Sequence, residues 1–380
     1  MGAPRLPHLR SHYGARNGEH APNGYSAEGR SASIHRCRPS LAEQAHPEYS
    51  RAMVPFSTGS LLLAPMVGIT NRAFRTLLFE LGGPDWYMTE MASAEAFLAG
   101  GRHEEVYLDP SPEPARTSVQ FAAKTPEILA AACVRLACLP EASRPAGIDI
   151  NLGCAAPHIR SSGKGAALLD NPDRAIAMVA AARARWEGIL SCKIRISSSA
   201  GIEGTLKLAA RLADEGLDFI TVHPRLDSQK FRRSADHAIT ALFARSLSIP
   251  VIANGDLADA EQAGSLFADA PVHSYMIGRQ AVRRPWIFAH GRSCARKDGL
   301  AGEPIDLCAL ALRFIDLVEQ MLPFEWQKES CRRFFSYFSE NMSFAHHFRF
   351  YLANAPTLDA MRQFCQDYFT QLPRDRFIAL

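Results

Sequence analysis

From Leu61 onward, short apolar runs bounded by glycine or proline alternate with longer stretches in which apolar residues recur at helical spacing. The short runs predict strands at residues 61–66, 86–91, 117–121, 148–153, 189–196, 218–223, 251–254 and 275–278. The longer stretches predict helices at residues 71–81, 92–98, 126–139, 173–186, 204–215, 236–246 and 258–268. This alternation favours an α/β fold, a closed (β/α)8 TIM barrel. A doubly wound open sheet is the second choice, because no GxGxxG turn follows the first predicted strand.

The pattern changes at both ends of the chain. Residues 1–55 are rich in Arg, His, Pro, Gly and Ser and have few aliphatic residues before Met53. Such a segment cannot bury enough apolar surface to fold, so we expect a disordered N-terminal tail. A tail whose arginines touch RNA, or an upstream extension of the reading frame with Met53 as the effective start, stays open. Residues 305–369 are helical in pattern and predict a C-terminal all-helical domain at 301–380, after a barrel domain at 56–300.

Composition excludes several classes of protein. The net charge of +3 is mild, so any nucleic-acid surface must be local. The cysteines number nine, an odd count, and contain no CxxC pair, which argues against a disulfide framework or a zinc site, and no metal is expected. No apolar run approaches the roughly 20 residues of a membrane span, and the N-terminus lacks the apolar core of a signal peptide. We therefore expect a cytoplasmic protein that does not enter a membrane.

Polar residues collect where the predicted strands end, and the carboxyl ends of barrel strands meet at one mouth. Gly255 and Gly278 follow the last two strands, where backbone N–H groups can approach an anion, and this is the usual phosphate site of such barrels. Arg279 adds a fork of donors. A simple role of both glycines in tight turns is the alternative. Lys193 alternates with apolar residues inside a strand, so we expect it to need an anionic or electron-rich partner rather than to be a solvated charge.

Motifs in a fixed order between residues 61 and 288 resemble one family. They are APMVGITNRAFR, TEM, VQF, DINLGC followed by GKGAALL, CKIRI, TVH, PVIANGD and MIGRQAVRRPWIF. Together they are similar to those of the tRNA-dihydrouridine synthases, FMN-dependent reductases of uracil bases in tRNA, with a weaker match over the C-terminal helices. The resemblance implies FMN as cofactor, NADPH as reductant and tRNA as partner, with no obligate protein partner.

The resemblance also implies roles for individual residues. The cofactor-binding residues would be Ala64, Pro65 and Met66 along the flavin ring, Gln120 and Lys193 at its polar edge, His223 beside the ring and ribityl chain, and Asn254, Gly255, Asp256, Gly278 and Arg279 at the phosphate. Cys154 would protonate C5 of the uracil while the flavin delivers hydride to C6. A free thiol, with a pKa of about 8.5, is mostly protonated at neutral pH and suits a general acid. A small buried hydrophobe is the alternative for Cys154.

The residues expected at the substrate are less specific. Asn151 is expected at the edge of the base, and an equally good alternative is a cap for the loop backbone. Arg160 and Lys164, in a loop at residues 158–164, are expected to close over the RNA backbone, with a solvated flexible loop as the alternative. Arg332 and Arg333 precede aromatic residues on a basic helix and are expected to bind tRNA, unless these aromatics pack the core and the charges are ordinary surface.

Three sequence differences separate this chain from the family pattern. Ala155 and Ala156 stand where the family usually has proline after the cysteine, Ala122 and Ala123 replace a glycine, and Pro224 replaces another. No reacting group is removed, so we expect differences in loop shape and substrate subtype. Two other functions stay open. One is an FMN barrel acting on a small molecule, like a dihydroorotate dehydrogenase or an ene-reductase. The other is a catalytically silent RNA-binding or chaperone barrel.

Overall fold

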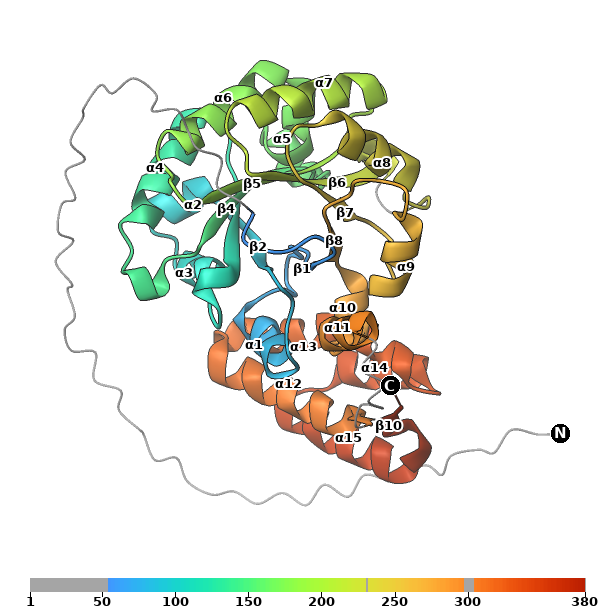
Figure 1. Ribbon diagram of the computed structural model, residues 1–380. Coiled ribbons are helices and arrows are strands. Elements are labelled where there is room, and N and C mark those ends of the chain that lie inside the picture. The colour runs from blue at the N-terminus through green and yellow to red at the C-terminus, as the bar shows by residue number, and fades with distance from the viewer. Residues whose placement is uncertain (1–53, 230–231, 297–303, 380) are drawn as a thin grey trace. The chain divides into compact units, whose positions relative to one another are not determined.

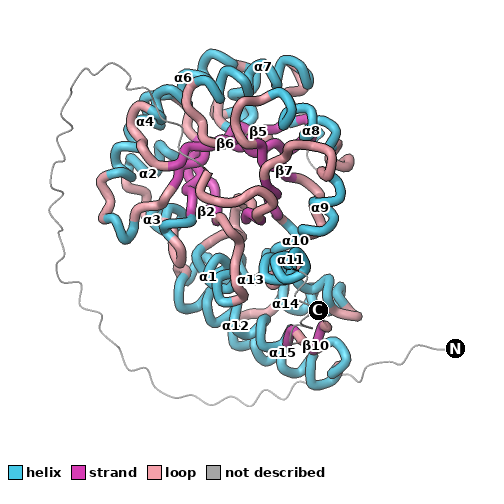
Figure 2. Tube along the Cα trace, viewed as in Figure 1, coloured by secondary structure: helices cyan, strands magenta, loops and turns pink. Residues whose placement is uncertain are grey.

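The computed structural model describes residues 54–229, 232–296 and 304–379, so nearly all of the predicted N-terminal tail lies outside the described residues. Eight strands form one parallel sheet, in the order β1-β8-β7-β6-β5-β4-β3-β2. They are β1 (Leu61–Leu63), β2 (Tyr87–Ser93), β3 (Thr117–Ala122), β4 (Gly147–Leu152), β5 (Ile189–Ile196), β6 (Phe219–Leu226), β7 (Val251–Asn254) and β8 (Ser274–Ile277). Figures 1 and 2 show the helices outside this ring of strands.

The sheet closes on itself between its first and last members. Leu62 forms a parallel bridge with Trp86, the residue just before β2, and the Leu63 N–H donates to the Trp86 carbonyl at 2.9 Å. With β1 also paired to β8, the ring is complete, and the predicted (β/α)8 TIM barrel is confirmed. The predicted strands agree with the observed ones to within a few residues. The first strand ends at Leu63, so Ala64, Pro65 and Met66 form a loop rather than the predicted strand end.

Helices follow most strands, as the periodicity predicts. In the barrel they are α1 (Arg72–Glu80), α2 (Ala94–Ala99), α3 (Glu104–Leu108), α4 (Pro126–Ala137), α5 (Pro157–Ser161), α6 (Pro172–Arg183), α7 (Gly201–Asp214), α8 (His237–Ser246), α9 (Ala260–Leu266), α10 (Arg279–Arg283) and α11 (Ile287–Arg296). Short 3-10 helices are η1 (Pro114–Arg116), η2 (Glu141–Ser143), η3 (Gly165–Asp170), η4 (Asp227–Gln229), η5 (Ser339–Asn341) and η6 (Pro373–Asp375).

Two segments differ from the sequence prediction. Residues 158–161, expected in a loop, belong to α5, because Pro157 occupies the first helical turn, where its missing N–H costs nothing. The crossover after α2, for which no further helix is predicted, contains α3. This helix has only five residues, too short for a periodic pattern to be recognised.

The side chains of the barrel strands alternate between two environments. In β4, Ile148, Ile150 and Leu152 pack in the hydrophobic cluster shared with the surrounding helices, which leaves Asp149 and Asn151 facing the barrel interior. The amino-terminal half of the interior is apolar instead. There the Phe56 ring contacts Trp86 and Phe219, with ring centroids 5.8 and 5.5 Å apart. The barrel is therefore filled at one end and polar at the carboxyl ends of its strands.

The C-terminal region is helical, as predicted. It contains α12 (Leu307–Met321), α13 (Phe324–Phe338), α14 (Ala345–Asn354) and α15 (Leu358–Gln371). Its ends form a small antiparallel pair of β9 (Ile305–Asp306) and β10 (Phe377–Ile378), so the prediction that residues 305 and 306 are helical is wrong. Asp306 instead caps α12 by accepting from the Ala309 N–H at 3.0 Å.

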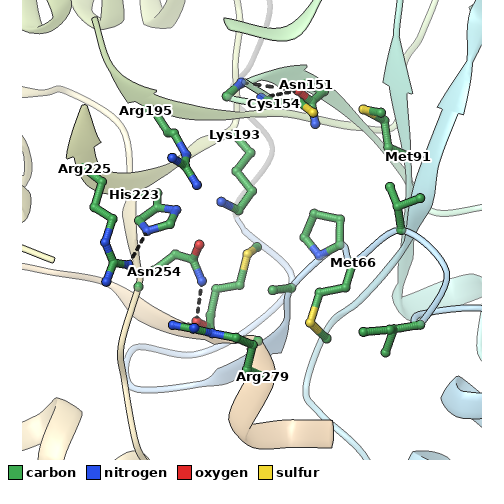
Figure 3. A pocket seen from close by; sticks show the side chains of 18 of the residues that line it. Met66, Met91, Asn151, Cys154, Lys193, Arg195, His223, Arg225, Asn254 and Arg279 are labelled. Atoms are coloured by element: carbon green, nitrogen blue, oxygen red, sulfur yellow. Dashed lines mark hydrogen bonds between the residues drawn. The ribbon is translucent and has the colours of Figure 1, made fainter. Parts of the chain in front are cut away.

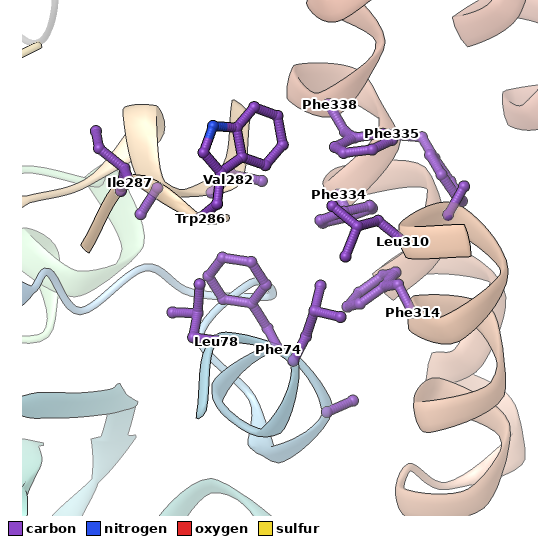
Figure 4. Packing of buried hydrophobic residues seen from close by; sticks show 14 of the residues in the cluster. Phe74, Leu78, Val282, Trp286, Ile287, Leu310, Phe314, Phe334, Phe335 and Phe338 are labelled. Carbon is purple, nitrogen blue, oxygen red and sulfur yellow. The ribbon is translucent and has the colours of Figure 1, made fainter. Parts of the chain in front are cut away.

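A single hydrophobic cluster joins this region to the barrel. Phe314 of α12 and Phe334 of α13 stack with ring centroids 3.9 Å apart, and Phe74 of α1 contacts both, with its centroid 6.4 and 6.1 Å from theirs (Figure 4). The sequence-predicted boundary at residue 300 lies outside the described residues and stays a prediction. None of the described helices is both long and apolar enough to cross a membrane.

Candidate active site

A cavity of about 900 Å³ opens at the carboxyl ends of the strands (Figure 3). Every residue that the sequence predicts for the cofactor lines it, as do Asn151 and Cys154. These cofactor candidates are Ala64, Pro65, Met66, Gln120, Lys193, His223, Asn254, Gly255, Asp256, Gly278 and Arg279. The structure thus brings together residues that are up to 215 positions apart, from Ala64 to Arg279. Their roles at a cofactor stay predictions.

The backbone of Cys154 is held from both sides. Its N–H donates to Asn151 Oδ1 at 2.9 Å, and its carbonyl accepts from the Ala166 N–H at 2.9 Å. Gly165 has a φ of +58°, and a Cβ there would lie 2.6 Å from the Cys154 carbonyl oxygen. Only glycine fits this backbone without strain. The GKGAALL segment therefore supports the cysteine at the cavity wall, although Arg160 and Lys164 near it point elsewhere.

A chain of hydrogen bonds leads from the barrel interior to Cys154. Asp149 accepts from Ser191 Oγ at 2.6 Å and from Gln120 Nε2 at 2.7 Å. Gln120 Oε1 in turn accepts from Asn151 Nδ2 at 2.8 Å. Because a carboxylate only accepts, Asp149 requires Gln120 to present its amide nitrogen. The chain then requires Asn151 to present Oδ1 to the Cys154 N–H. Asn151 thus performs the backbone-capping role considered as its alternative, while it also lines the cavity.

Lys193 lies deep in the cavity and points toward the space between His223 and Met66 (Figure 3). Burial and the Arg195 guanidinium lower the pKa of Lys193 to about 7, although Asp149 acts in the opposite direction. Among the described residues its ammonium has no hydrogen-bond partner. An ammonium in this position favours an anionic or electron-rich ligand. Burial also raises the pKa of Asp149 to about 6.

The opposite end of the cavity is built from charged groups. Asp256 forms ion pairs with Arg225 and, at 2.9 Å, with Arg279. Burial acts to raise the pKa of Asp256, but the Ala235 N–H and the Arg225 guanidinium outweigh it and lower this pKa. His223 is 3.0 Å from Arg225, and burial together with Lys193 lowers its pKa. The imidazole is therefore neutral and accepts from the guanidinium, whose nitrogens only donate.

Gly255 allows this end to close tightly. Its φ is +114°, and a Cβ would lie 2.8 Å from Cδ2 of His223. Gly278, by contrast, has room for a side chain, since the nearest atom to a Cβ there is 3.6 Å away. The alternative that the two glycines serve tight turns is therefore better supported for Gly255 than for Gly278. Gly255 has a strict backbone requirement, and Gly278 does not.

Cations outnumber carboxylates along the cavity wall. The lining cations are Lys193, Arg195, Arg225, Arg279 and Arg283, and the lining carboxylates are Asp256 and Glu340. Such a surface attracts an anionic ligand of cofactor size. Among the described residues, no group of three or more His, Cys, Asp or Glu side chains could hold a metal ion.

Two predicted substrate residues from the Cys154 loop do not line the cavity. Arg160 pairs with Asp227 and, at 2.5 Å, with Asp170. Lys164 pairs with Glu95 at 2.5 Å. These ion pairs tie the segment after Cys154 to neighbouring loops, so the two cations support that segment in this conformation.

The other two predicted substrate residues lie on α13 and also do not line the cavity. Arg333 donates to Glu329 Oε1 at 2.8 Å and to the Val67 carbonyl at 3.2 Å. It thereby joins α13 to the loop that follows β1. Arg332 is half-buried. The interpretation of these arginines as RNA contacts stays a prediction, and the contacts observed for Arg333 are structural.

Sequence reasoning missed several lining residues. Arg225 follows His223 by two positions on β6, so the period of a strand could have placed it in the interior. Tyr337 and Glu340 come from α13 and η5, and Glu340 forms an ion pair with Arg283 of α10. No local pattern indicates that the helical region reaches the cavity, because this contact depends on how α13 packs on the barrel.

Comparison with known proteins gives consistent names. The model of the family described as dihydrouridine synthase (Dus) matches residues 62–372. The tRNA-dihydrouridine synthase B of Serratia marcescens is 33% identical over 231 residues, 61% of this chain and 68% of that protein. The tRNA-dihydrouridine synthase B of Xanthomonas campestris pv. campestris is 29% identical over 321 residues, 82% of this chain and 93% of that protein. Among solved structures, 6-hydroxypseudooxynicotine amine oxidase from Pseudomonas geniculata N1 aligns over 66% of this chain and 50% of that one. Its TM-score of 0.48 and identity of 10% are too low to bear on function.

Proposed function

Because the chain belongs to the dihydrouridine synthase family, we propose that it reduces the C5=C6 bond of uridines in tRNA, giving 5,6-dihydrouridine. The proposal includes FMN as cofactor, NADPH as the reductant of FMN, and Cys154 as the proton donor to C5. When bound, reduced FMN supplies the hydride that C6 receives. The names of the curated relatives support tRNA as the substrate.

The wall of the cavity supports the choice of FMN. Arg225 and Arg279 would bind the phosphate beside the backbone of Gly255 and Gly278. Lys193 would donate to the polar edge of the isoalloxazine, and Ala64, Pro65 and Met66 would pack along the ring. Asp256 would keep the two arginines in place, since it pairs with both of them.

The fixed backbone of Cys154 is the observation that carries the proposal. A general acid must lie at a defined point relative to the atom that it protonates. The bonds from Asn151 and Ala166, together with the close packing of Gly165, hold the cysteine at such a point on the cavity wall. The uracil has to leave its RNA stack to reach this wall. Asn151, which also lines the cavity, would then bind the edge of the base with its remaining hydrogen-bonding capacity.

The test replaces Cys154 by alanine. Cys154→Ala should retain bound flavin and its reduction by NADPH, because no proposed cofactor contact is lost. Formation of dihydrouridine in unmodified tRNA, measured by mass spectrometry of nucleosides, should fall by at least about 100-fold, as expected for loss of a general acid.

Cys138→Ala is the matched control. Cys138 is an exposed cysteine that follows α4 on the outside of the barrel, so its removal should leave the rate unchanged. Undiminished dihydrouridine formation by Cys154→Ala would refute the role of Cys154 as proton donor. A wild-type protein that oxidises NADPH with orotate or an enone, but not with tRNA, would refute tRNA as the substrate.

A further inference from the structure

The turn after β7 has a backbone conformation that most residues avoid. Gly255 has a φ of +114°, and Asp256, which follows it, has a φ of +50°. Asp256 is the only residue other than glycine with a positive φ in the parts of the chain that the structure describes. Such a conformation persists where the surrounding structure fixes it. Contacts from another part of the chain are therefore expected at this turn.

The segment that leads into α8 makes two contacts with the turn. The Ala235 N–H donates to Asp256 Oδ2 at 3.0 Å. Two residues later, Nε2 of His237 lies 2.7 Å from the carbonyl oxygen of Gly255. Because a carbonyl oxygen only accepts, Nε2 of His237 carries the proton and donates. One short segment thus holds both the side chain and the backbone of the turn.

The imidazole of His237 is itself held in this orientation. Its second nitrogen, Nδ1, lies 3.3 Å from the hydroxyl of Thr240, a fully buried residue. The ring also meets Phe267 of α9 edge to face, with centroids 5.2 Å apart and planes at 87°. Burial lowers the pKa of His237, although the Gly255 carbonyl and Asp256 act in the opposite direction. The imidazole is therefore neutral at pH 7, and Nδ1 accepts from Thr240.

The bond from His237 sets the direction of the next backbone N–H. In a trans peptide, the C=O and the N–H of one plane point in opposite directions. The carbonyl of Gly255 points toward His237, so the N–H of Asp256 points away from α8, which lies outside the ring of strands (Figure 1). Among the described residues this N–H has no acceptor. Gly255 and Asp256 both line the cavity, so a donor is available at its phosphate end.

We propose that His237 is a positioning residue for the phosphate of FMN. By donating to the Gly255 carbonyl, it keeps the Asp256 N–H directed at that phosphate. Backbone N–H groups held in a turn are a common means of binding an anion. His237 acts only through the turn, because it does not line the cavity. This inference rests on the proposed function, since it concerns the cofactor that this function requires.

The experiment titrates the full-length protein, freed of flavin, with FMN and separately with riboflavin, which lacks the phosphate. His237→Phe retains a ring of similar size beside Phe267 but cannot donate. It should raise the Kd of FMN by about tenfold, at the lower end of what one hydrogen bond to a charged group contributes. The Kd of riboflavin should not change. An unchanged Kd of FMN, or an equal loss of affinity for both flavins, would overturn the proposal.

His237→Gln tests whether the donated hydrogen bond is what matters. The amide nitrogen of a glutamine side chain can take the place of Nε2 and donate to the same carbonyl. The affinity of this variant for FMN should therefore stay close to the wild-type value. If His237 only fills space beside Phe267, phenylalanine should replace it better than glutamine does. A larger loss of FMN affinity in His237→Gln than in His237→Phe would thus overturn the proposal.

His273→Phe is the matched control. His273 is half-buried like His237, its Nδ1 lies 2.8 Å from the hydroxyl of Ser274, and its ring meets Phe56 edge to face at 5.7 Å. It lies at the amino-terminal end of the barrel, where β8 begins. Its replacement should leave the affinity for FMN unchanged. A loss of FMN affinity as large as that of His237→Phe would overturn the proposal, because the effect would not depend on the turn.

The wild-type titrations separate this inference from the proposed function. If the wild-type protein binds FMN more tightly than riboflavin and His237→Phe shows the same preference, only the role of His237 is refuted. If the wild-type protein binds neither flavin, the proposed function is refuted together with this inference. If it binds both flavins equally, the phosphate end of the cavity is wrongly placed, which overturns the role of His237 but leaves a flavin-dependent reduction of tRNA standing.

Discussion

The two ends of the cavity are held by different forces. At Cys154, neutral hydrogen bonds from Gln120 through Asn151, and the close packing of Gly165, fix the direction of each group. At Asp256, ion pairs with Arg225 and Arg279 provide charge. Hydrogen bonds are directional, whereas charges act over several ångströms and tolerate small displacements. We therefore expect the Cys154 end to determine reaction geometry and the Asp256 end to determine cofactor affinity.

The sharpest test of this division removes a charge from the Asp256 end. Arg225→Met should weaken FMN binding by about 100-fold, because a charge-assisted hydrogen bond to a phosphate contributes up to about 3 kcal/mol. Isothermal titration of the apoprotein with FMN measures the change. At saturating FMN, the turnover number with tRNA should fall much less.

Arg211→Met serves as its control, because Arg211 on α7 forms an exposed ion pair with Asp173 and lies outside the cavity lining. Arg225 is only 3% exposed, so circular dichroism should confirm that the variant folds. Arg279→Met, at a more exposed position, should give a smaller loss of about tenfold. Unchanged FMN affinity in both cavity variants would mean that charge does not hold the cofactor.

A matched pair of glycine variants probes the two ends in the same way. Gly165→Ala and Gly255→Ala each place a Cβ at a positive φ and within 2.8 Å of a neighbouring atom, a strain of at least about 1 kcal/mol. We expect Gly165→Ala to lower the rate of uridine reduction about tenfold with FMN affinity intact. Gly255→Ala should instead lower FMN affinity by a similar factor. Equal losses of both quantities in both variants would contradict the division.

These contacts also show how far the sequence could predict the site. Alternation along one strand correctly predicts that Lys193 lies inside the barrel, because side chains on a strand have a period of two. Order along the chain suffices to collect the cofactor candidates, since the carboxyl ends of all strands in a parallel barrel meet. The closing contact of Gly165 with the Cys154 carbonyl depends on tertiary packing that no local period encodes.

In the helical region, the sequence predicts the helices but not which of their aromatic side chains are buried. Its apolar period correctly predicts the helices, but the same period is produced by a ring in the core and a ring at a surface. Phe334 and Phe350 occur in similar aromatic and basic sequences, and only packing separates the buried ring from the exposed one. The choice of Arg333 as an RNA contact has the same weakness, because its bond to the Val67 carbonyl spans 266 positions.

A third test uses pH and concerns Lys193, which lies between the two ends. Its pKa is about 7 in the free protein, and a bound anionic cofactor should raise this pKa. Binding then favours the protonated form, so FMN affinity should be highest below pH 7 and fall by up to about fivefold from pH 7 to 8. Titrations with FMN in this range avoid the phosphate ionisation, which has a pKa of about 6. Lys193→Met should bind FMN more weakly and show no such decline, and a wild-type affinity that is constant with pH would contradict the assignment.

The smallest expected effect comes from the hydrogen-bond chain and isolates its directional role. In Asp149→Asn, the new amide can still accept from Gln120 if its nitrogen faces Ser191 Oγ, which can turn to accept. This variant and Ser191→Ala should therefore each retain most of the rate of flavin oxidation by tRNA. In the double variant, the new amide at position 149 has lost Ser191 Oγ as the acceptor for its nitrogen, so nothing fixes which of its two ends faces Gln120. The amide groups of Gln120 and then Asn151 can therefore flip, which would turn an N–H donor of Asn151 toward the Cys154 N–H.

We expect a coupling of about 1 kcal/mol between the two sites, about a fivefold loss beyond additivity, in single-turnover rates. FMN affinity should stay additive, because the charged end is untouched. Strict additivity in the rates as well would mean that Asp149 only fills space and that the direction of the chain does not reach Cys154.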